Sequence, residues 1–188
     1  MKNYRKIPNN AQLVFKGILH DTYQWQQKMF DGNIATFEAL RRKPSVITIA
    51  TTIDFQIIII EESQPNNQDR ITLSGGIVDD EDLLNNAKRE LLEETGYTSE
   101  EWSFWKKIDI LEYSKLEWES NFFIAKNCNK VAEQKLDNGE KIEVKLLSFN
   151  EFISLVQTNK FSNSFLRNYI LEARNKPKMI REFYELIF

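Results

Sequence analysis

Three glutamates, Glu90, Glu93 and Glu94, are spaced three and four residues apart in a segment with helical periodicity. Residues at this spacing are neighbours on one face of a helix, so we expect the three carboxylates to share one patch. Like charges placed in this way destabilise a helix by roughly 0.2–0.5 kcal/mol per pair. Because a bound divalent cation would remove this cost, the spacing predicts a metal site rather than an ordinary solvated, salt-bridged helix face.

The expected metal is a hard cation. The nearby candidate ligands are oxygens, and the only histidine, His20, lies far away in the sequence. Oxygen ligands favour Mg²⁺, with Mn²⁺ as the second choice, over zinc. Such an ion can bridge pyrophosphate oxygens and lower the pKa of a bound water. We therefore expect metal-assisted hydrolysis of a pyrophosphate, with two phosphomonoesters as products.

The acidic cluster lies within a longer motif, GGIVDDEDLLNNAKRELLEETGY. Seven residues stand at fixed spacings and two more are bulky and apolar at set positions: Gly75, Glu81, Arg89, Glu90, Glu93, Glu94 and Gly96, with Leu91 and Tyr97. This pattern resembles the Nudix box at every fixed identity, which is a specific signal. The resemblance implies a Nudix hydrolase of α+β class, in which an α/β/α sandwich surrounds a mixed β-sheet.

Roles for the other motif residues follow from the resemblance and from helix geometry. In the family, a backbone carbonyl at the position of Gly75 helps the glutamates to hold the metal. Gly76 has no Cβ, so the backbone can approach substrate phosphate closely. Arg89 lies four residues before Glu93 and is expected to orient that carboxylate. Glu81 is either a charge favoured by the helix dipole or an outer support of the site.

The wider chain resembles the ADP-ribose pyrophosphatase branch, whose N-terminal antiparallel sheet usually forms a homodimer. The segment 23–42 looks like that extension. By resemblance Trp25 is a candidate for stacking on a nucleobase, and Arg41 or Arg42 for gripping phosphate; core packing and solvation are the alternatives. Glu140 resembles the distal carboxylate of this branch, a metal ligand or a base, although Asn138-Gly139 also reads as a plain hairpin turn. Either Glu93 or Glu140 would then assist deprotonation of water.

Two departures weaken the match to ADP-ribose itself. The glycine that usually follows the acids at Asp79 and Asp80 is absent, so the loop is one residue shorter. The branch also tends to carry a glutamine-aromatic-arginine stretch where this chain has Ser63-Gln64-Pro65. The substrate is therefore expected to be ADP-ribose or a nucleotide sugar.

The overall composition excludes several function classes. The 188 residues are 41% apolar and 28% charged with a net charge of −3, which is typical of one soluble domain and gives no attraction for nucleic acid or membrane. The longest apolar run, Ile57 to Ile60, is too short to cross a bilayer and suits a strand buried on both faces. The lone Cys128 suits packing better than nucleophilic chemistry, and with no apolar leader a cytoplasmic location is expected.

Hydrophobic periodicity and turn residues place the expected elements. Strands are expected at 14–17, 21–30, 34–40, 46–50, 55–61, 70–73, 102–110, 116–125 and 141–148, with a turn at 127–129. Helices are expected at 81–95, ended by Gly96; at 151–158, capped by Asn150; from Ser162 or Asn163 to about Arg174; and from Pro177 onwards. The tryptophans Trp102, Trp105 and Trp118 are expected to pack. We expect a β extension over residues 1–44 and a Nudix domain over 45–188.

Two alternatives to the nucleoside diphosphate hydrolase remain open. A non-catalytic Nudix module would bind a nucleotide and regulate something else, although binding alone does not require three carboxylates on one turn. A nucleoside triphosphate pyrophosphohydrolase would use the same motif and release inorganic pyrophosphate. The motif fixes the bond that is broken, while loops outside it read the attached groups.

Overall fold

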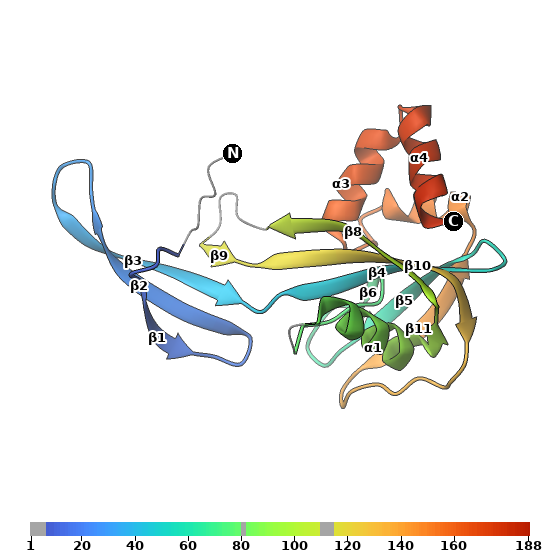
Figure 1. The fold of residues 1–188 in the computed structure, drawn as a ribbon, viewed down its shortest axis with the longest axis horizontal. Helices are drawn as coiled ribbons and strands as arrows, with labels where there is room; N and C mark the ends of the chain where they lie inside the picture. Colours follow the sequence, from blue (N-terminus) through green and yellow to red (C-terminus); the bar gives the residue numbers. More distant parts are fainter. Residues whose placement is uncertain (1–6, 80–81, 110–114) are drawn as a thin grey trace.

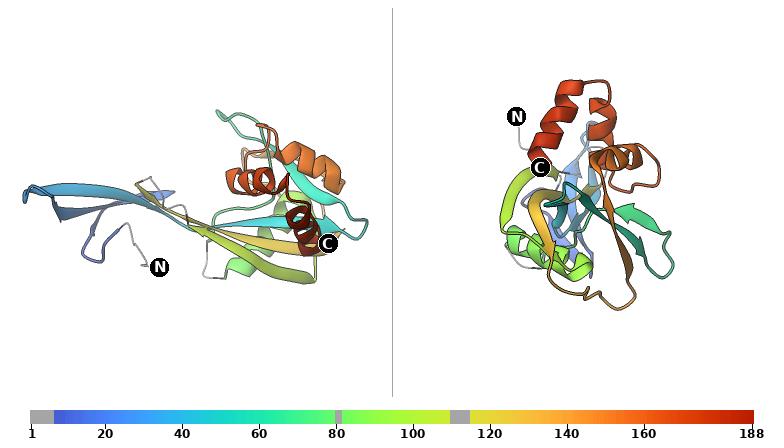
Figure 2. Two further views of the ribbon diagram at one scale, coloured as in Figure 1. Left: turned by 90° about the horizontal axis from the view of Figure 1, so that it is seen from above. Right: turned by 90° about the vertical axis from the view of Figure 1, so that its right-hand side faces the viewer.

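The computed structural model describes residues 7–79, 82–109 and 115–188, in which two β-sheets and four helices are arranged along a long axis (Figure 1). One sheet has four strands in the order β1-β2-β3-β9 and projects as an arm from the rest of the molecule (Figures 1 and 2). Its strands are β1 (Gln12–Lys16), β2 (His20–Lys28), β3 (Ile34–Arg42) and β9 (Leu116–Glu117). The turn between β2 and β3 contains Gly32 with a φ of 89°, a backbone conformation that glycine adopts readily. The expected small N-terminal sheet is therefore confirmed.

The larger sheet has seven strands and is mixed. Its main path runs β11-β5-β4-β10-β7, with β6 paired to β5 and β8 paired to β10. The β4–β10 pair is parallel and the other pairs are antiparallel. The strands are β4 (Ser45–Thr52), β5 (Ile57–Ser63), β6 (Arg70–Thr72), β7 (Tyr97–Thr98), β8 (Glu101–Asp109), β10 (Glu119–Lys130) and β11 (Lys141–Leu147).

Alternation along the central strands sends side chains into two separate cores, because successive residues of a strand point to opposite faces. On β5, Ile57 and Ile59 belong to one buried cluster and Ile58 to another. On β10, Ile124 faces the first cluster while Ala125 faces the second. The run from Ile57 to Ile60 is at most 2% exposed, so the prediction of a strand buried on both faces is confirmed.

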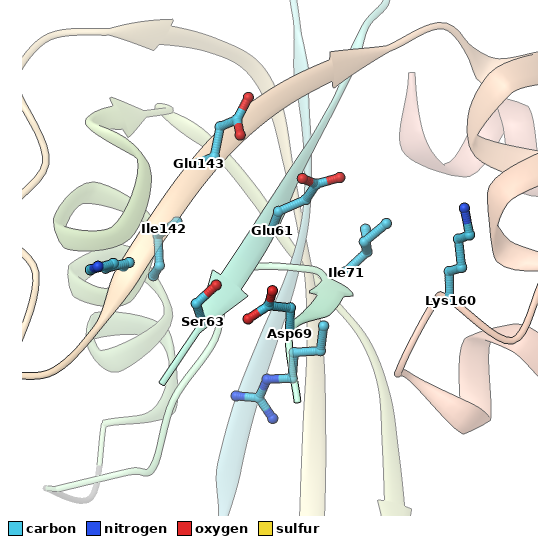
Figure 3. Close-up of a pocket in the computed structure, with 9 residues that line it drawn as sticks. Glu61, Ser63, Asp69, Ile71, Ile142, Glu143 and Lys160 are labelled. Carbon is cyan, nitrogen blue, oxygen red and sulfur yellow. The ribbon is translucent and has the colours of Figure 1, made fainter. Parts of the chain in front are cut away.

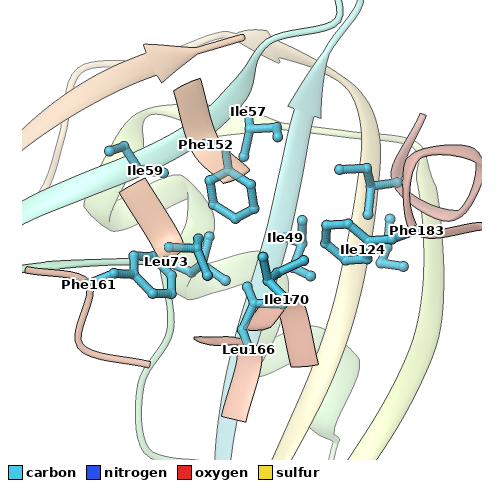
Figure 4. Close-up of a cluster of buried hydrophobic side chains, with 12 residues drawn as sticks. Ile49, Ile57, Ile59, Leu73, Ile124, Phe152, Phe161, Leu166, Ile170 and Phe183 are labelled. Carbon is cyan, nitrogen blue, oxygen red and sulfur yellow. The ribbon is translucent and has the colours of Figure 1, made fainter. Parts of the chain in front are cut away.

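Three C-terminal helices cover one face of the larger sheet, and one helix covers the other (Figures 1 and 2). The C-terminal helices are α2 (Phe149–Val156), α3 (Ser164–Ala173) and α4 (Pro177–Ile187). They contribute Phe152, Ile170 and Phe183 to the larger core cluster (Figure 4). The opposite face is covered by α1 (Leu83–Thr95), whose Ala87 and Leu91 are fully buried. The α/β/α sandwich with a mixed sheet is confirmed.

The helix that carries the acids begins two residues later than expected. Asp82 caps it by accepting a hydrogen bond from the backbone of Asn85 at 3.0 Å, and the helix ends at Gly96, which has a φ of 76°. A carboxylate at the N-cap position is favoured both as a cap and by the helix dipole. Glu81 and Asp80 lie outside the described residues.

Two further boundaries differ from the sequence-based expectation. Instead of one strand over 116–125 and a turn at 127–129, the two-residue β9 pairs with β3 in the smaller sheet, and β10 runs on to Lys130. A bulge between Ala125 and Cys128, with Asn127 at a φ of 53°, absorbs the extra residue without ending the strand. The cap of α2 is Ser148 rather than Asn150, because Ser148 and Glu151 form a reciprocal capping box.

Cys128 agrees with the expectation that it is a packing residue. The thiol is buried and hydrogen-bonds to the backbone oxygen of Ala125, and burial raises its pKa to about 12. A thiol held protonated in this way is a packing residue, not a nucleophile. Within the described residues, no helix is both long and apolar enough to cross a membrane. The division of the chain at residues 44 and 45 stays a prediction.

Candidate active site

A cavity of about 660 Å³ opens at the acidic face of α1, where the two sheets approach each other. It brings together most of the residues that the sequence singled out, from elements far apart along the chain. Its lining includes Arg42, Glu62, Gln64, Arg70, Gly75, Gly76, Asp79, Arg89, Glu90, Glu93, Glu94, Trp118, Lys135, Asp137 and Glu140. The prediction that Glu90, Glu93 and Glu94 share one face is confirmed by this common cavity.

The three carboxylates differ in burial. Glu94 is 8% exposed and accepts a hydrogen bond from the backbone N–H of Gly75 at 3.0 Å. Burial raises its pKa to about 8, and the charges of Glu90 and Glu62 act in the same direction. Burial also raises the pKa of Glu90, to which the charges of Glu93 and Glu140 contribute. The cavity wall therefore concentrates negative charge in a place where the charged forms are disfavoured.

Arg89 pairs with its neighbours on the helix, as expected. Its guanidinium lies 2.9 Å from Glu93 across one helical turn, 2.8 Å from Glu90 and 3.5 Å from Asp79. It also donates to the side chain of Asn86 at 3.3 Å. These contacts hold the guanidinium against the helix and fix the rotamers of the two glutamates that it touches, so the geometry supports an orienting role.

The side chains of Glu90, Glu93 and Glu94 form the acidic wall of the cavity on α1, called the α1 wall below. The donor set of this wall fits a hard divalent cation. It consists of carboxylate oxygens, and burial raises the pKa of two of these carboxyl groups, Glu90 and Glu94. Within the residues that the structure describes, no three acidic, histidine or cysteine side chains already converge closely enough to enclose an ion. A cation would therefore draw Glu90, Glu93 and Glu94 closer together and offset their mutual repulsion.

The two glycines of the motif meet different neighbours. A Cβ at Gly75 would lie 2.2 Å from the backbone oxygen of Val46, so the backbone itself leaves no room for a side chain. A Cβ at Gly76 would lie 2.4 Å from the carboxylate of Glu90. A larger residue at position 76 would therefore collide with Glu90, a glutamate of the α1 wall. This agrees with the expected close approach of the backbone to the site.

Glu140 lines the same cavity and belongs to the segment between β10 and β11. It accepts a hydrogen bond from the side chain of Gln64 at 3.3 Å, and Gln64 also donates to Glu62 at 2.6 Å. Glu62 is 3% exposed and is held by Arg70 through two hydrogen bonds of 2.8 and 2.9 Å. Burial raises the pKa of Glu140, and the charges of Glu62 and Asp137 add to this effect.

The two candidate arginines have different surroundings. Arg41 is paired with Glu117 at 2.8 Å and stacks over Tyr23, and it does not line the cavity. Arg42 lines the cavity, where burial and the charge of Arg70 lower its pKa. Among the described residues Arg42 has no ion-pair partner. Its guanidinium instead lies over the ring of Trp118, 4.5 Å from the centroid.

The tryptophans divide between packing and the site. Trp105 packs against Phe122, Tyr169 and Phe183 in the larger core, which confirms that expectation. Trp118, expected only to pack, lines the cavity beneath Arg42.

Nothing in the local sequence of Trp118 links it to Arg42. The parallel register of β3 with β9, which aligns Arg41 with Glu117, brings the two residues together.

Trp25 is not brought to the cavity. It packs on Phe37 with ring centroids 5.9 Å apart and bonds to Gln27 on the smaller sheet. Its role in stacking on a nucleobase stays a prediction.

A second cavity of about 600 Å³ lies on the opposite face of β5 (Figure 3). Glu61 and Ser63 line it, whereas Glu62 and Gln64, which alternate with them along the strand, line the first cavity. Acids and bases are mixed here, and Glu61 is paired with Lys145 at 2.6 Å. This cavity lacks the acidic face of α1.

Comparison with known proteins places this geometry in a family. The model of the NUDIX domain matches residues 41–169, well over half of the chain. A solved structure titled "Crystal structure of ADP compounds hydrolase" has a TM-score of 0.69 with 16% sequence identity, covering 90% of this chain and 92% of that one. The comparison with curated protein sequences gave no match. The chain belongs to the Nudix family and, with the acids of the box in place, is a Nudix hydrolase.

Substitution of the two glycines separates effects on protein stability from effects on metal binding. Gly76→Ala should leave the free energy of unfolding within about 0.5 kcal/mol of the wild type, because the flexible Glu90 side chain can move aside. It should weaken Mn²⁺ binding by about tenfold or more, because Glu90 is displaced. Gly75→Ala, which meets backbone, should cost about 1–3 kcal/mol of stability. Urea unfolding and calorimetric titration measure both quantities; equal Mn²⁺ affinity in Gly76→Ala would remove Glu90 from the ion site.

Proposed function

We propose that this protein hydrolyses the pyrophosphate bond of a nucleoside diphosphate derivative, ADP-ribose or a nucleotide sugar, in a reaction that depends on Mg²⁺ or Mn²⁺. The observation that carries the proposal is the meeting of Glu90, Glu93 and Glu94 with Glu140 in one cavity. The likeness in fold to a protein titled as an ADP compounds hydrolase supports this substrate class. The products would be two phosphomonoesters.

The acids of α1 would hold the metal together with the backbone oxygen of Gly75. When bound, the metal supplies charge that neutralises pyrophosphate oxygens and acidifies a coordinated water. Burial raises the pKa of Glu90 and Glu94, so a positive charge bound beside them would favour their ionised forms. Arg89 keeps Glu90 and Glu93 in place but makes no contact that would replace a divalent ion at Glu94.

Glu93 or Glu140 would take the proton from the attacking water. The water oxygen forms a bond to one phosphorus, the bond from that phosphorus to the bridging oxygen breaks, and the second phosphate leaves with the bridging oxygen. A base with a raised pKa holds this proton more readily, and Glu140 has a pKa shifted in that direction. Glu93 is already engaged in an ion pair with Arg89 at 2.9 Å.

Arg42 is the cation that we assign to the substrate phosphates. It lines the cavity without a carboxylate partner among the described residues, and Trp118 supports the guanidinium from beneath. A desolvated cation without a counter-ion favours an anionic ligand, and a planar guanidinium can bind phosphate through two hydrogen bonds. Arg41 is satisfied by Glu117 and so is the weaker candidate.

We further propose that two copies associate through the smaller sheet, as the family resemblance implies. Support comes from a set of large apolar side chains exposed on it. Phe15 is 64% exposed, Ile18 97% and Ile34 70%, and Phe30 is fully exposed. An apolar surface of this kind is typical of an interface. The cytoplasmic location expected from the sequence stays a prediction.

The first test of this function is hydrolysis by the purified protein with Mg²⁺ and a panel of ADP-ribose, nucleotide sugars, diadenosine polyphosphates and nucleoside triphosphates. We expect phosphomonoesters from the diphosphate derivatives. Glu94→Gln should lower kcat by about 1,000-fold or more, since metal assistance supplies several kcal/mol and each 1.36 kcal/mol is tenfold in rate. The exposed Glu100→Gln is the matched control. If no compound is hydrolysed, the result would favour a non-catalytic binding module. Release of inorganic pyrophosphate from a nucleoside triphosphate would favour a triphosphate pyrophosphohydrolase.

The second test compares neighbouring arginines. Arg42→Met should raise KM for the preferred diphosphate roughly 10- to 100-fold, because a charge-assisted hydrogen bond contributes about 1.5–3 kcal/mol. Arg41→Met should change KM less than about threefold, since an exposed ion pair contributes little. Steady-state kinetics on the two variants decides between them, and a larger effect at Arg41 would reverse the assignment.

The third test is the molar mass in solution. Light scattering should give twice the 22.2 kDa of one chain. Replacing Phe15 and Ile34 together with serine should shift the protein towards the monomer, because apolar burial contributes about 25 cal/mol per Å². Phe55→Ser, at an equally exposed site outside the smaller sheet, serves as the control. A wild-type mass of one chain would refute association.

A further inference from the structure

The segment 131–140, which joins β10 to β11 and carries Glu140, has no regular secondary structure. It crosses the C-terminal end of α1, where the last backbone oxygens of a helix lack partners within the helix. Its own donors supply those partners. The backbone N–H groups of Val131 and Ala132 donate to Gly96, at 2.9 and 3.2 Å, and that of Lys135 donates to Glu93 at 2.8 Å.

One side chain completes this set of contacts. The amide nitrogen of Gln134 donates to the backbone oxygen of Glu94 and, at 3.2 Å, to that of Ile142. A side-chain amide nitrogen has two hydrogens, so both are used. The two acceptors lie on different elements, at the end of α1 and near the start of β11. Gln134 is half-buried, whereas Glu133 and Lys135 on either side are exposed.

These contacts couple the two acidic walls of the cavity. Lys135 and Gln134 are anchored on the backbones of Glu93 and Glu94, the residues whose side chains form the α1 wall. Ile142 follows Glu140 by two residues, so Gln134 fixes the chain on the far side of that glutamate. Between these anchors the turn at Gly139, with a φ of 97°, closes through a 3.1 Å bond from Glu140 to Asp137.

We infer that Gln134 is a positioning residue that sets the place of Glu140 relative to the carboxylates of α1 by hydrogen-bonding to both Glu94 and Ile142. This inference rests on the proposed hydrolysis, because it assigns Glu140 to that reaction. Gln134 itself does not line the cavity and touches no reacting group. Glutamine is suited to make both hydrogen bonds, since asparagine is one methylene shorter and glutamate has no donor for two backbone oxygens.

The test uses Gln134→Met, which has a similar length and no donor, with Glu133→Gln as the adjacent control, whose native side chain is 93% exposed. Hydrogen exchange should show faster exchange across 131–140 in Gln134→Met, while α1 keeps its protection. The melting temperature should fall by less than about 10 °C, because the loss is confined to two part-buried hydrogen bonds made by one side chain. Unchanged exchange in the segment would overturn the inference.

Kinetics then separate positioning from general stability. Gln134→Met should lower kcat on the order of tenfold to a hundredfold, as expected for a displaced catalytic group, with KM changed less than about twofold. In a Glu140→Gln background it should cause no further loss, because the two residues act through one group. Losses that multiply, or full activity of Glu140→Gln, would contradict the inference. If the wild type hydrolyses no compound, the proposed function fails, and the exchange result alone decides whether Gln134 anchors the segment.

Discussion

Burial of negative charge at one end of α1 is the constraint on which the rest of this structure depends. Glu94 lies almost wholly out of solvent, with a backbone N–H of Gly75 as its partner, and Glu90 lies against Gly76. Both carboxylates have raised pKa values because water is excluded from them and like charges are near. Such an arrangement opposes folding, and it persists because the surrounding sandwich holds the helix in place.

The two-layered core provides that support. Ala87 and Leu91 bury one face of α1 against the sheet, while Glu90 and Glu94 face the cavity. On the other side of the sheet, the C-terminal helices fill a larger aromatic and aliphatic core around Phe183. Because side chains alternate along β4, β5 and β10, each central strand contributes to both cores. A shift of one residue in these strands would exchange the two faces and remove the apolar surface against which α1 packs.

The cavity is electrostatically uneven, which bears on the ligand it can accept. The α1 wall and Glu140 are acidic, while Arg42 over Trp118 supplies a cation without a counter-ion among the described residues. Arg70 is positive but already neutralised by Glu62. A ligand with several phosphate oxygens suits a cavity with such a guanidinium better than a neutral ligand does.

The sequence by itself determined the chemistry of the α1 wall and the class of fold. Helical spacing alone places Glu90, Glu93, Glu94 and Arg89 together, and period-2 patterns with turn residues define the strands, because these are local properties of the backbone. It could not decide between Arg41 and Arg42, or find Trp118 and Gln134. The positions of these residues depend on the parallel pairing of β3 with β9 and on a loop folded across the end of α1. Contacts between residues about 40 to 80 positions apart depend on how the sheets and loops pack, and no local periodicity records that packing.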